Sequence, residues 1–330
     1  MRLKHARAVR ASAFLILTAL SGCDNLQWGG AEVRVVKPPP PAGQVQGAPA
    51  LAEQTNLGLP RGTVLFHVIR SQGQDRLVPV AEVSGDSLRT IQRPAGVSPQ
   101  AFEQRFRDAV LPANTQFVLF RRGAPVGTFT LQQPGPVTSC GVPTGVGQAA
   151  TVAAAAADQE FLAFRRGLEP QVVGEFSPPQ LDGPIRRYAA LVAERLVLQS
   201  GMPRPGSWTR SQRDLQAFDL VRGGSPEMAT TFLSGDNLAV GPAENEGWSV
   251  FYVAAYEQRT GYNPVYSEVA DYRKVPKRAP KLVDALNWNG KGGNDMLVQV
   301  FGARDSWYEA VSADHGGRWT KVWEGKACRQ

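Results

Sequence analysis

The sequence predicts a mainly β body built from repeated β-hairpins, and three observations support this fold class. Short apolar runs recur along the chain and are separated by glycine, proline and asparagine, which is the pattern of strands and turns. Two runs nearly repeat each other: FVLFRRGAPVGTF begins at Phe117 and FLAFRRGLEPQVVGEF begins at Phe161. Helical periodicity marks two segments. We therefore expect stacked sheets with two helices packed against them.

The start of the chain predicts a signal peptide over residues 1–22. Four Lys or Arg residues and no acid lie in Met1–Arg10, and the apolar run Ala11–Leu20 follows. A membrane-spanning helix needs about 20 apolar residues, and this run is about half as long. A short apolar core after a basic start is typical of a signal peptide.

The motif Leu20-Ser21-Gly22-Cys23 ends this segment. It resembles the lipobox of bacterial lipoproteins, in which an aliphatic residue and two small residues precede an obligatory cysteine. The resemblance implies cleavage between Gly22 and Cys23 and a diacylglycerol thioether on Cys23. Two or more acyl chains would then anchor the protein durably to a membrane, facing the periplasm or the cell surface. An ordinary cleaved signal peptide with a chance cysteine is the alternative.

Asp24 follows the cysteine. An aspartate at this position resembles the signal that retains lipoproteins on the inner membrane of enteric bacteria. The rule differs between bacteria, so the choice between inner and outer membrane stays open.

Cleavage would also remove most of the positive charge. The chain has 36 Lys and Arg against 29 Asp and Glu, a net charge of +7, and without the four cations of residues 1–22 the balance is 32 against 29, or +3. So small a charge gives no case for binding nucleic acid, which requires a concentrated basic face.

Residues 23–60 predict a tether that carries the lipidated cysteine. They lack periodic apolar positions and contain the run Pro38–Pro41 among Gly, Ala and Gln. A segment of this composition buries too little surface to fold and behaves as a semi-extended linker.

The folded part is expected to form two β-rich lobes, over residues 61–180 and 205–330, joined by a linking helix over 181–204. The runs Phe117–Phe120 and Phe161–Phe164 are apolar on both faces, so the strands must be covered on both sides. The arginine pair that ends each run is expected to be solvated. Strand starts at residues 117, 161, 251 and 298 recur at multiples of about 45 residues. This period makes a single β-propeller the alternative architecture.

Two amphipathic segments predict packing helices. Ser98-Pro99 provides an N-cap and a first-turn proline for the first, whose face carries Phe102 and Phe106. The second begins near Asp182 and ends at Gly201. Its expected packing side consists of Ile185, Tyr188, Ala189, Val192 and Leu196.

Two cysteines remain after Cys23, namely Cys140 and Cys328. An exported protein meets oxidising conditions, in which an even pair of cysteines usually forms a disulfide. The alternative is a reactive thiol at Cys140.

Two segments of the C-terminal part align at an offset of 68 residues, AFDLVRGGSPEMATTFL from Ala217 and ALNWNGKGGNDMLVQVF from Ala285. They are similar to the FG-GAP or VCBS repeats of integrin-type propellers, whose acidic loop between two short strands chelates Ca²⁺. The matching positions are Asp219, Glu227, Asn287, Asn289 and Asp295. Lys291 stands in place of the central acid, so we carry over the fold of the repeat and not its metal, and we expect no cofactor.

Catalytic residues are not assigned. The chain has three histidines, one of them in the signal peptide, which are too few for a histidine triad and a zinc site. His67 shares a strand face with Leu65 and Ile69 and is expected to be a buried or edge histidine and not a catalytic one. We expect a non-enzymatic binding or scaffold protein of the envelope with an envelope protein or a glycan as partner. An envelope hydrolase that cleaves cell-wall glycan with carboxylates is the alternative.

Aromatic residues in the C-terminal part are expected to form mainly core between sheets, and some of them could form a surface on which such a partner stacks. They are Trp248, Tyr252, Tyr256, Tyr262, Tyr266, Trp307, Tyr308, Trp319 and Trp323.

Overall fold

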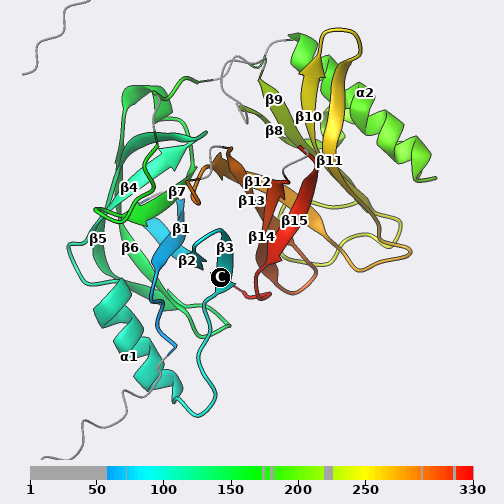
Figure 1. The fold of residues 1–330 in the computed structure, drawn as a ribbon. Helices are drawn as coiled ribbons and strands as arrows, with labels where there is room; N and C mark the ends of the chain where they lie inside the picture. Colours follow the sequence, from blue (N-terminus) through cyan, green and yellow to red (C-terminus); the bar gives the residue numbers. More distant parts are fainter. Residues whose placement is uncertain are drawn as a thin grey trace, which may run out of the picture. The chain divides into compact units, whose positions relative to one another are not determined.

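Antiparallel strands are the main secondary structure of the described chain in the structure, which is a computed structural model (Figure 1). It describes residues 58–71, 73–172, 175–178, 181, 183–218, 226–290, 293–314 and 317–329. The predicted signal peptide, the lipobox and nearly all of the predicted tether lie outside these residues. The prediction of a mainly β body with packing helices is confirmed.

The first sheet closes into a six-stranded antiparallel barrel. Its strand order is β1-β7-β4-β5-β6-β2, the pairing of β1 with β2 closes the ring, and β3 adds to β2. The strands are β1 (Thr63–Ile69), β2 (Asp75–Ser84), β3 (Ser87–Thr90), β4 (Gln116–Arg121), β5 (Ala124–Val137), β6 (Pro143–Thr151) and β7 (Glu160–Arg165). A short 3-10 helix, Ala153–Ala155, connects β6 to β7.

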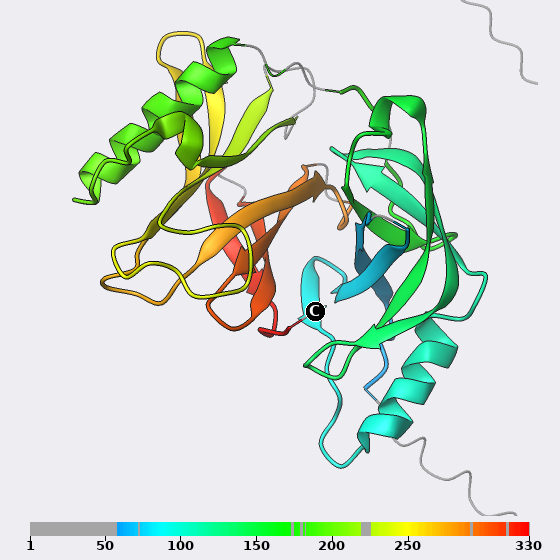
Figure 2. The same ribbon diagram turned by 180° about the vertical axis from the view of Figure 1, so that it is seen from behind.

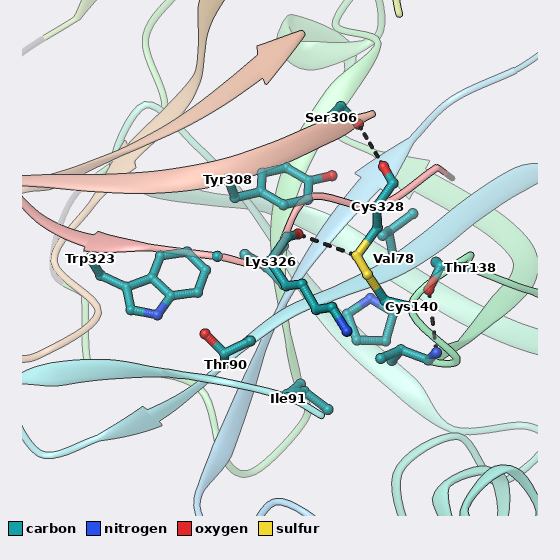
Figure 3. A pocket seen from close by; sticks show the side chains of 14 residues that line it. Val78, Thr90, Ile91, Thr138, Cys140, Ser306, Tyr308, Trp323, Lys326 and Cys328 are labelled. Atoms are coloured by element: carbon teal, nitrogen blue, oxygen red, sulfur yellow. Dashed lines mark hydrogen bonds between the residues drawn. A yellow bond between two sulfur atoms is a disulfide. The ribbon is translucent and has the colours of Figure 1, made fainter. Parts of the chain in front are cut away.

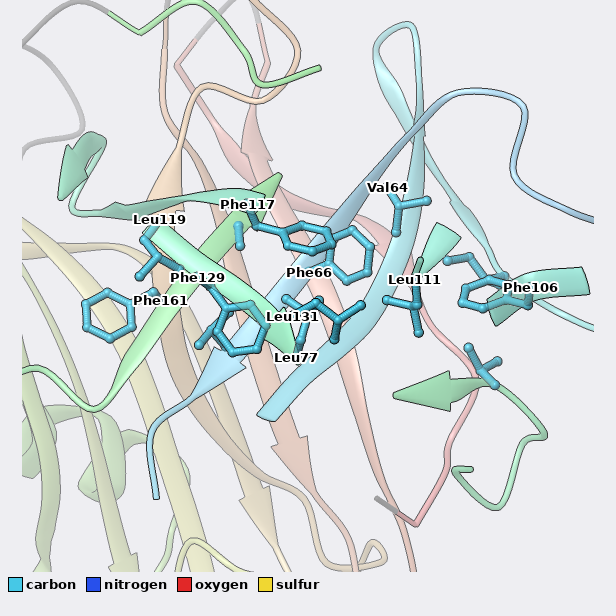
Figure 4. Packing of buried hydrophobic residues seen from close by; sticks show 14 of the residues in the cluster. Val64, Phe66, Leu77, Phe106, Leu111, Phe117, Leu119, Phe129, Leu131 and Phe161 are labelled. Atoms are coloured by element: carbon cyan, nitrogen blue, oxygen red, sulfur yellow. The ribbon is translucent and has the colours of Figure 1, made fainter. Parts of the chain in front are cut away.

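Alternate residues of these strands fill the barrel, as Figure 4 shows. Phe66, Phe117, Phe129 and Phe161 are buried in one apolar cluster. Helix α1 (Pro99–Val110) adds Phe102 and Phe106 to the same cluster. It begins as predicted, because Ser98 accepts a hydrogen bond from the backbone N–H of Ala101 at 3.2 Å and proline occupies the first turn.

The outward-facing residues of the barrel strands are buried as well. Leu65, Phe120, Leu162 and Phe164 belong to a second cluster that includes Leu297 of β13 (Asp295–Phe301). Strands that are apolar on both faces are therefore covered on both faces, as their sequence indicates. This second cluster connects the barrel to the C-terminal sheet.

The two nearly identical stretches are neighbours in the barrel wall. β4 and β7 pair antiparallel, with Val118 opposite Phe164 and Leu119 opposite Ala163. The strands that start near Phe251 and Val298 lie in other sheets. The recurrence at about 45 residues thus does not mark successive propeller blades. The described residues form a closed barrel and two open sheets.

Each of the other two sheets is a four-stranded meander in which every strand pairs with the next one along the chain. The first consists of β8 (Gln212–Phe218), β9 (Glu227–Ser234), β10 (Trp248–Glu257) and β11 (Gly261–Asp271). The second consists of β12 (Ala279–Leu286), β13, β14 (Ser306–Ala313) and β15 (Trp319–Glu324). The two meanders share an apolar core that contains Phe251, Val253, Met296 and Val298.

Helix α2 (Gly183–Gln199) packs on the first meander, and Figure 2 shows it along the outside of that sheet. Ile185, Ala189 and Val192 join a cluster with Trp248 and Tyr252 of β10. The Tyr252 hydroxyl donates to the carbonyl of Ala189 at 2.6 Å. A short helix α3 (Trp208–Ser211) follows and leads into β8.

One residue of the expected packing side of α2 is turned outward. Tyr188 is exposed, because the buried stripe of the helix centres on Ala189 and Val192 and Tyr188 falls at its margin. Its ring rests against Tyr262 of β11, with ring centroids 5.6 Å apart. The prediction that Tyr188 lies on the packing side of α2 is therefore wrong.

Residues 55–330 form one compact unit. The division into two lobes at residues 181–204 stays a prediction from the sequence. No helix among the described residues is both long and apolar enough to cross a membrane.

Candidate functional site

The sequence-predicted residues fall into two groups. Gly22, Cys23 and Asp219 lie outside the described residues, whereas Glu227 begins β9. The aligned segments become equivalent hairpins, because β8 pairs with β9 and β12 pairs with β13 at the start of each meander. The offset of 68 residues therefore corresponds to a repeated structural unit.

In the second hairpin the retained polar residues organise the turn that follows β12. Asn289 donates from Nδ2 to Oδ2 of Asp295 at 2.8 Å, and the Ser312 hydroxyl donates to Oδ1 of Asp295 at 2.5 Å. Gly290 adopts a φ of +75°, which favours glycine. Asn287 lies between β12 and these residues. Within the described ranges, no group of three or more His, Cys, Asp or Glu residues is placed to hold a metal ion.

Cys140 and Cys328 form a disulfide, with Cα atoms 5.5 Å apart, which agrees with the pairing that the cysteine count indicates. Cys140 lies in the turn between β5 and β6, and Cys328 follows β15. Backbone hydrogen bonds join Cys328 to Ser306 at 2.8 and 3.0 Å. Arg329 donates its backbone N–H to the Ser139 hydroxyl at 2.7 Å. The C-terminal segment is thus fastened to both the barrel and the second meander.

A cavity of about 50 Å³ lies beside this disulfide (Figure 3). Val78, Tyr308, Trp323 and Lys326 are among its lining residues. The volume is large enough for a few water molecules and far below the several hundred Å³ of a pocket for an organic ligand. The cavity therefore does not define a substrate site.

A wider open hollow lies beside the turn between β1 and β2, where Arg70 and Arg76 contribute to its wall. The Arg70 guanidinium already donates to the carbonyl oxygens of Ala156 at 2.9 Å and Asp158 at 3.3 Å. The guanidinium of Arg70 is therefore held by the loop before β7, and it does not define an anion site in this hollow.

A buried polar junction joins the barrel to the second meander. A hydrogen bond of 2.9 Å connects Nδ1 of His67 to the hydroxyl of Tyr308, and Nε2 of His67 lies 3.9 Å from Oε1 of Glu160. Lys281 pairs with the other oxygen of Glu160. Burial lowers the pKa of His67 to about 4, against the opposing effect of Glu160. The imidazole is therefore neutral at pH 7, and of the buried and edge positions expected for His67 the structure shows the buried one.

Arg121 forms the second half of this junction, and its expected solvation is wrong. Its guanidinium donates to the Val283 carbonyl at 2.7 Å, to Gln216 at 3.0 Å and to Asp158 at 3.2 Å. The buried Asp284 carboxylate lies 3.7 Å away and accepts the backbone N–H of the following residue in the β4–β5 turn at 2.8 Å. The guanidinium of Arg121 therefore has its partners within the fold, which supports a structural role for this half of the junction.

An aromatic–charged cluster lies where β11 meets β14 and β15. We define it by Tyr266, Glu268, Arg278, Trp307, Glu309, Trp319, Lys321 and Glu324. The three rings pack against the core that the two meanders share and remain half-buried. They come from three different strands.

Arg278 holds the carboxylates of the cluster in place. It donates from Nε to Glu268 at 2.7 Å, pairs with Glu309 through a second nitrogen, and covers the ring of Trp307 at 5.6 Å. Trp307 donates from Nε1 to Glu309 at 2.7 Å. The inner part of the cluster is thus rigid and internally paired.

The outer part of the cluster is accessible. Lys321 and Glu324 are exposed and pair with each other, and this contact lowers the pKa of Glu324. Burial raises the pKa of Glu309, whose side chain is 0% exposed. Rings at the margin and exposed charged groups beside them form a surface that can stack on a ligand and hydrogen-bond it.

The sequence analysis named the rings of this cluster and missed all of its charged residues, which are Glu268, Arg278, Glu309, Lys321 and Glu324. One signal was present, because Glu309 interrupts an otherwise apolar strand and alternation places it on the face of Trp307. Arg278 lies outside any strand and gave no signal.

Comparisons of the chain with protein-family models, with curated proteins and with solved structures gave no match. The function is therefore argued from the residues of the chain itself.

Proposed function

We propose that this chain is a lipid-anchored cell-envelope protein that binds a partner of the envelope without transforming it. The observation that carries the proposal is the aromatic–charged cluster, where Tyr266, Trp307 and Trp319 meet the exposed Lys321 and Glu324. Flat rings offer stacking surface, and a few fixed polar groups give orientation, which is how sites for polar ligands are built.

The cluster favours a glycan over a protein as the partner. A sugar ring presents an apolar face to an aromatic side chain and hydroxyl groups to neighbouring charges. Lys321 offers N–H donors and Glu324 offers acceptors beside the rings. The resemblance to the lipobox supports a location at the membrane of the cell envelope. The tether of residues 23–60 would let the body reach envelope glycan.

The hydrolase alternative would need two carboxylates that reach the substrate on either side of the bond to be cleaved. In the cluster Glu309 has no exposed side-chain surface, and Glu268 is held by Arg278. This arrangement supports binding better than hydrolysis.

Sedimentation with purified cell-wall glycan tests the proposed binding. Trp319→Ala is expected to reduce the bound fraction about tenfold, because removal of one stacking ring costs about 1.4 kcal/mol of binding free energy. Val322→Ala on the same strand is the matched control, since Val322 is exposed and lies outside the cluster. Equal loss in both variants would contradict the assignment of the cluster.

If the unmodified chain does not sediment with glycan, a photo-crosslinker at position 319 tests whether the partner is a protein. A single envelope protein captured at position 319 and not at position 322 would support a protein partner. Mass spectrometry of the N-terminal peptide of the mature chain tests the anchor separately, because an acylated Cys23 is expected there. An intact residue 1–22 segment would refute the address.

A further inference from the structure

The outer face of α2 presents apolar side chains to solvent. Leu191 is 56% exposed, Leu198 is 49% exposed and Tyr188 is 39% exposed, although the opposite side of the helix is buried against the first meander. A helix of a soluble body normally turns polar residues outward. We define the outer face of α2 by Arg187, Tyr188, Leu191, Arg195 and Leu198.

The apolar surface continues from the helix onto the β10–β11 hairpin. Tyr188 packs against Tyr262, which packs against the exposed Tyr256 with ring centroids 5.4 Å apart. Tyr256 lies near the end of β10 and Tyr262 near the start of β11. The exposed Tyr188 and Tyr256 thus pack on the same buried ring of Tyr262, so the exposed apolar residues of α2 and of the hairpin are neighbours, and groups of exposed apolar residues mark interaction sites.

Positive charge accompanies this patch. Arg186, Arg187 and Arg195 are exposed, and none of them forms an ion pair among the described residues. The single acid of α2, Glu194, pairs with Arg204 at 3.0 Å. The outer face of α2 is thus cationic.

Arginine and leucine alternate along this face. Arg187, Leu191, Arg195 and Leu198 follow each other at helical spacing on one stripe. Arginine and tyrosine also occur in the cores of protein–protein interfaces, so a protein partner is an outcome that the test has to separate. At a bilayer surface, leucine enters the acyl boundary while arginine extends its stem and places its charge among the headgroups.

We propose that the outer face of α2 rests on the anionic lipid surface of the membrane that holds the chain. Its arginines complement the lipid phosphates, and Leu191, Leu198 and Tyr188 bury in the interfacial region. This inference rests on the proposed function, because the acyl anchor is what holds the chain at that membrane. The contact can be weak and still persist, because an anchored body samples the surface at high effective concentration.

The chain between the anchor and the described body is long enough for this contact. Residue 58 follows residue 23 by 35 positions, and a chain of 35 residues spans at most about 120 Å. The tether therefore permits α2 to reach the bilayer.

A fluorescent probe on the mature chain, isolated with its anchor and placed in vesicles, tests the contact. An environment-sensitive probe attached to Leu191→Cys is expected to shift to the blue in vesicles containing phosphatidylglycerol and to be quenched by lipid-borne quenchers. The same probe at Leu168→Cys is the matched control, because Leu168 is 53% exposed in the turn after β7. In phosphatidylcholine vesicles the two positions should respond alike.

Charge removal provides the second arm. With Arg187→Gln and Arg195→Gln together, the ratio of chains with α2 on the bilayer to chains with α2 away from it, measured from the blue shift, is expected to fall about 30-fold, since each arginine near an anionic surface contributes about a factor of five. Identical responses at positions 191 and 168 in phosphatidylglycerol vesicles would overturn the proposal. Protection of position 191 only when envelope proteins are present would assign this face to a protein instead.

Failure of the anchor can be told apart from failure of this contact. If mass spectrometry shows no acyl chain on Cys23, the same probe pair is titrated with free phosphatidylglycerol vesicles. A shift at position 191 alone would then uphold the membrane contact without the anchor, and its absence would refute it.

Discussion

The residues next to His67 along the chain predict a buried or edge position for it. They do not predict its hydrogen-bond and charge partners. It alternates with apolar residues on β1, so its strand face had to be covered. Its hydrogen-bond partner Tyr308 lies 241 positions away, and Glu160 belongs to another strand. Periodicity reports which side of a strand is buried, and it carries no information about the polar group that will face it there.

The neutral state of His67 gives the protein a defined response to acid. Its pKa is lowered from 6.5 to about 4 in the folded chain, so below pH 6.5 the unfolded chain binds a proton that the folded chain does not. Stability is therefore complete above pH 6.5 and falls as the pH decreases toward 4. Between pH 6.5 and 5 the loss from this group is about 2 kcal/mol.

Urea unfolding at pH 7 and pH 5 measures this term when the chain is compared with His67→Asn. The variant should lose less stability than the unmodified chain over the same interval, by about 2 kcal/mol. Burial opposes ionisation of Glu160, but the pKa of this carboxylate is lowered because the cations Lys281 and Arg121 stabilise its charge, so it titrates below the interval. Equal losses in both chains would show that His67 is protonated in the fold.

At the scale of elements, β4 and β7 show that one sequence motif can end in a buried or in an exposed environment. Both strands read Phe-x-x-Phe-Arg-Arg-Gly, and both turns use a glycine with positive φ, +73° at Gly123 and +87° at Gly167. The turn and strand geometry could thus be predicted from local residues. The arginine that ends β4 is buried against β12, whereas Arg165 at the end of β7 is exposed. Which strand end meets another sheet depends on the packing of distant segments.

This difference predicts unequal costs for the same substitution. Arg121→Met is expected to reduce the free energy of unfolding by about 3–5 kcal/mol, because it leaves the buried Asp284 without its cation. Arg165→Met should change it by no more than about 0.5 kcal/mol. Urea denaturation of the two variants provides the comparison, and similar costs would argue against the buried ion network.

The helices were predicted more completely than the sheets. Ser98 and Pro99 mark the start of α1, and Gly201, with a φ of +66°, stops α2 where the sequence indicates. These signals are local, so the chain itself carries them. Tyr188 is the exception, because a tyrosine at the margin of a helical stripe can turn to either side, and the adjacent hairpin decides which.

At the scale of the whole molecule, the disulfide between Cys140 and Cys328 is a covalent link over 188 positions. It attaches the last described segment to the barrel, and the cluster of Leu65, Leu162 and Leu297 packs the same two parts together. The barrel and the second meander are thus held by covalent, apolar and ionic contacts at once.

Removal of this link is expected to destabilise the chain. In the loop-entropy description a cross-link over so long a loop contributes up to about 5 kcal/mol, so Cys140→Ser should lower the thermal midpoint and the urea midpoint clearly. Cys328→Ser should have the same effect, and the two substitutions together should cost no more than either alone. Additive losses in the double variant would show that each cysteine acts separately from the bond.

By itself the sequence determined what depends on neighbours along the chain: the β-rich class, the turns, both helices, a buried or edge position for His67 and the pairing of Cys140 with Cys328. It also predicts the acyl anchor, which concerns residues outside the described part. Only the tertiary structure decided that the repeated strands share one barrel and that Arg121 is buried. It also brought Glu309, Arg278 and three rings together and left α2 with an apolar outer face. The physical reason is that hydrogen-bonded local geometry and alternation act over a few residues, whereas the choice of partner across sheets depends on which distant surfaces exclude water together.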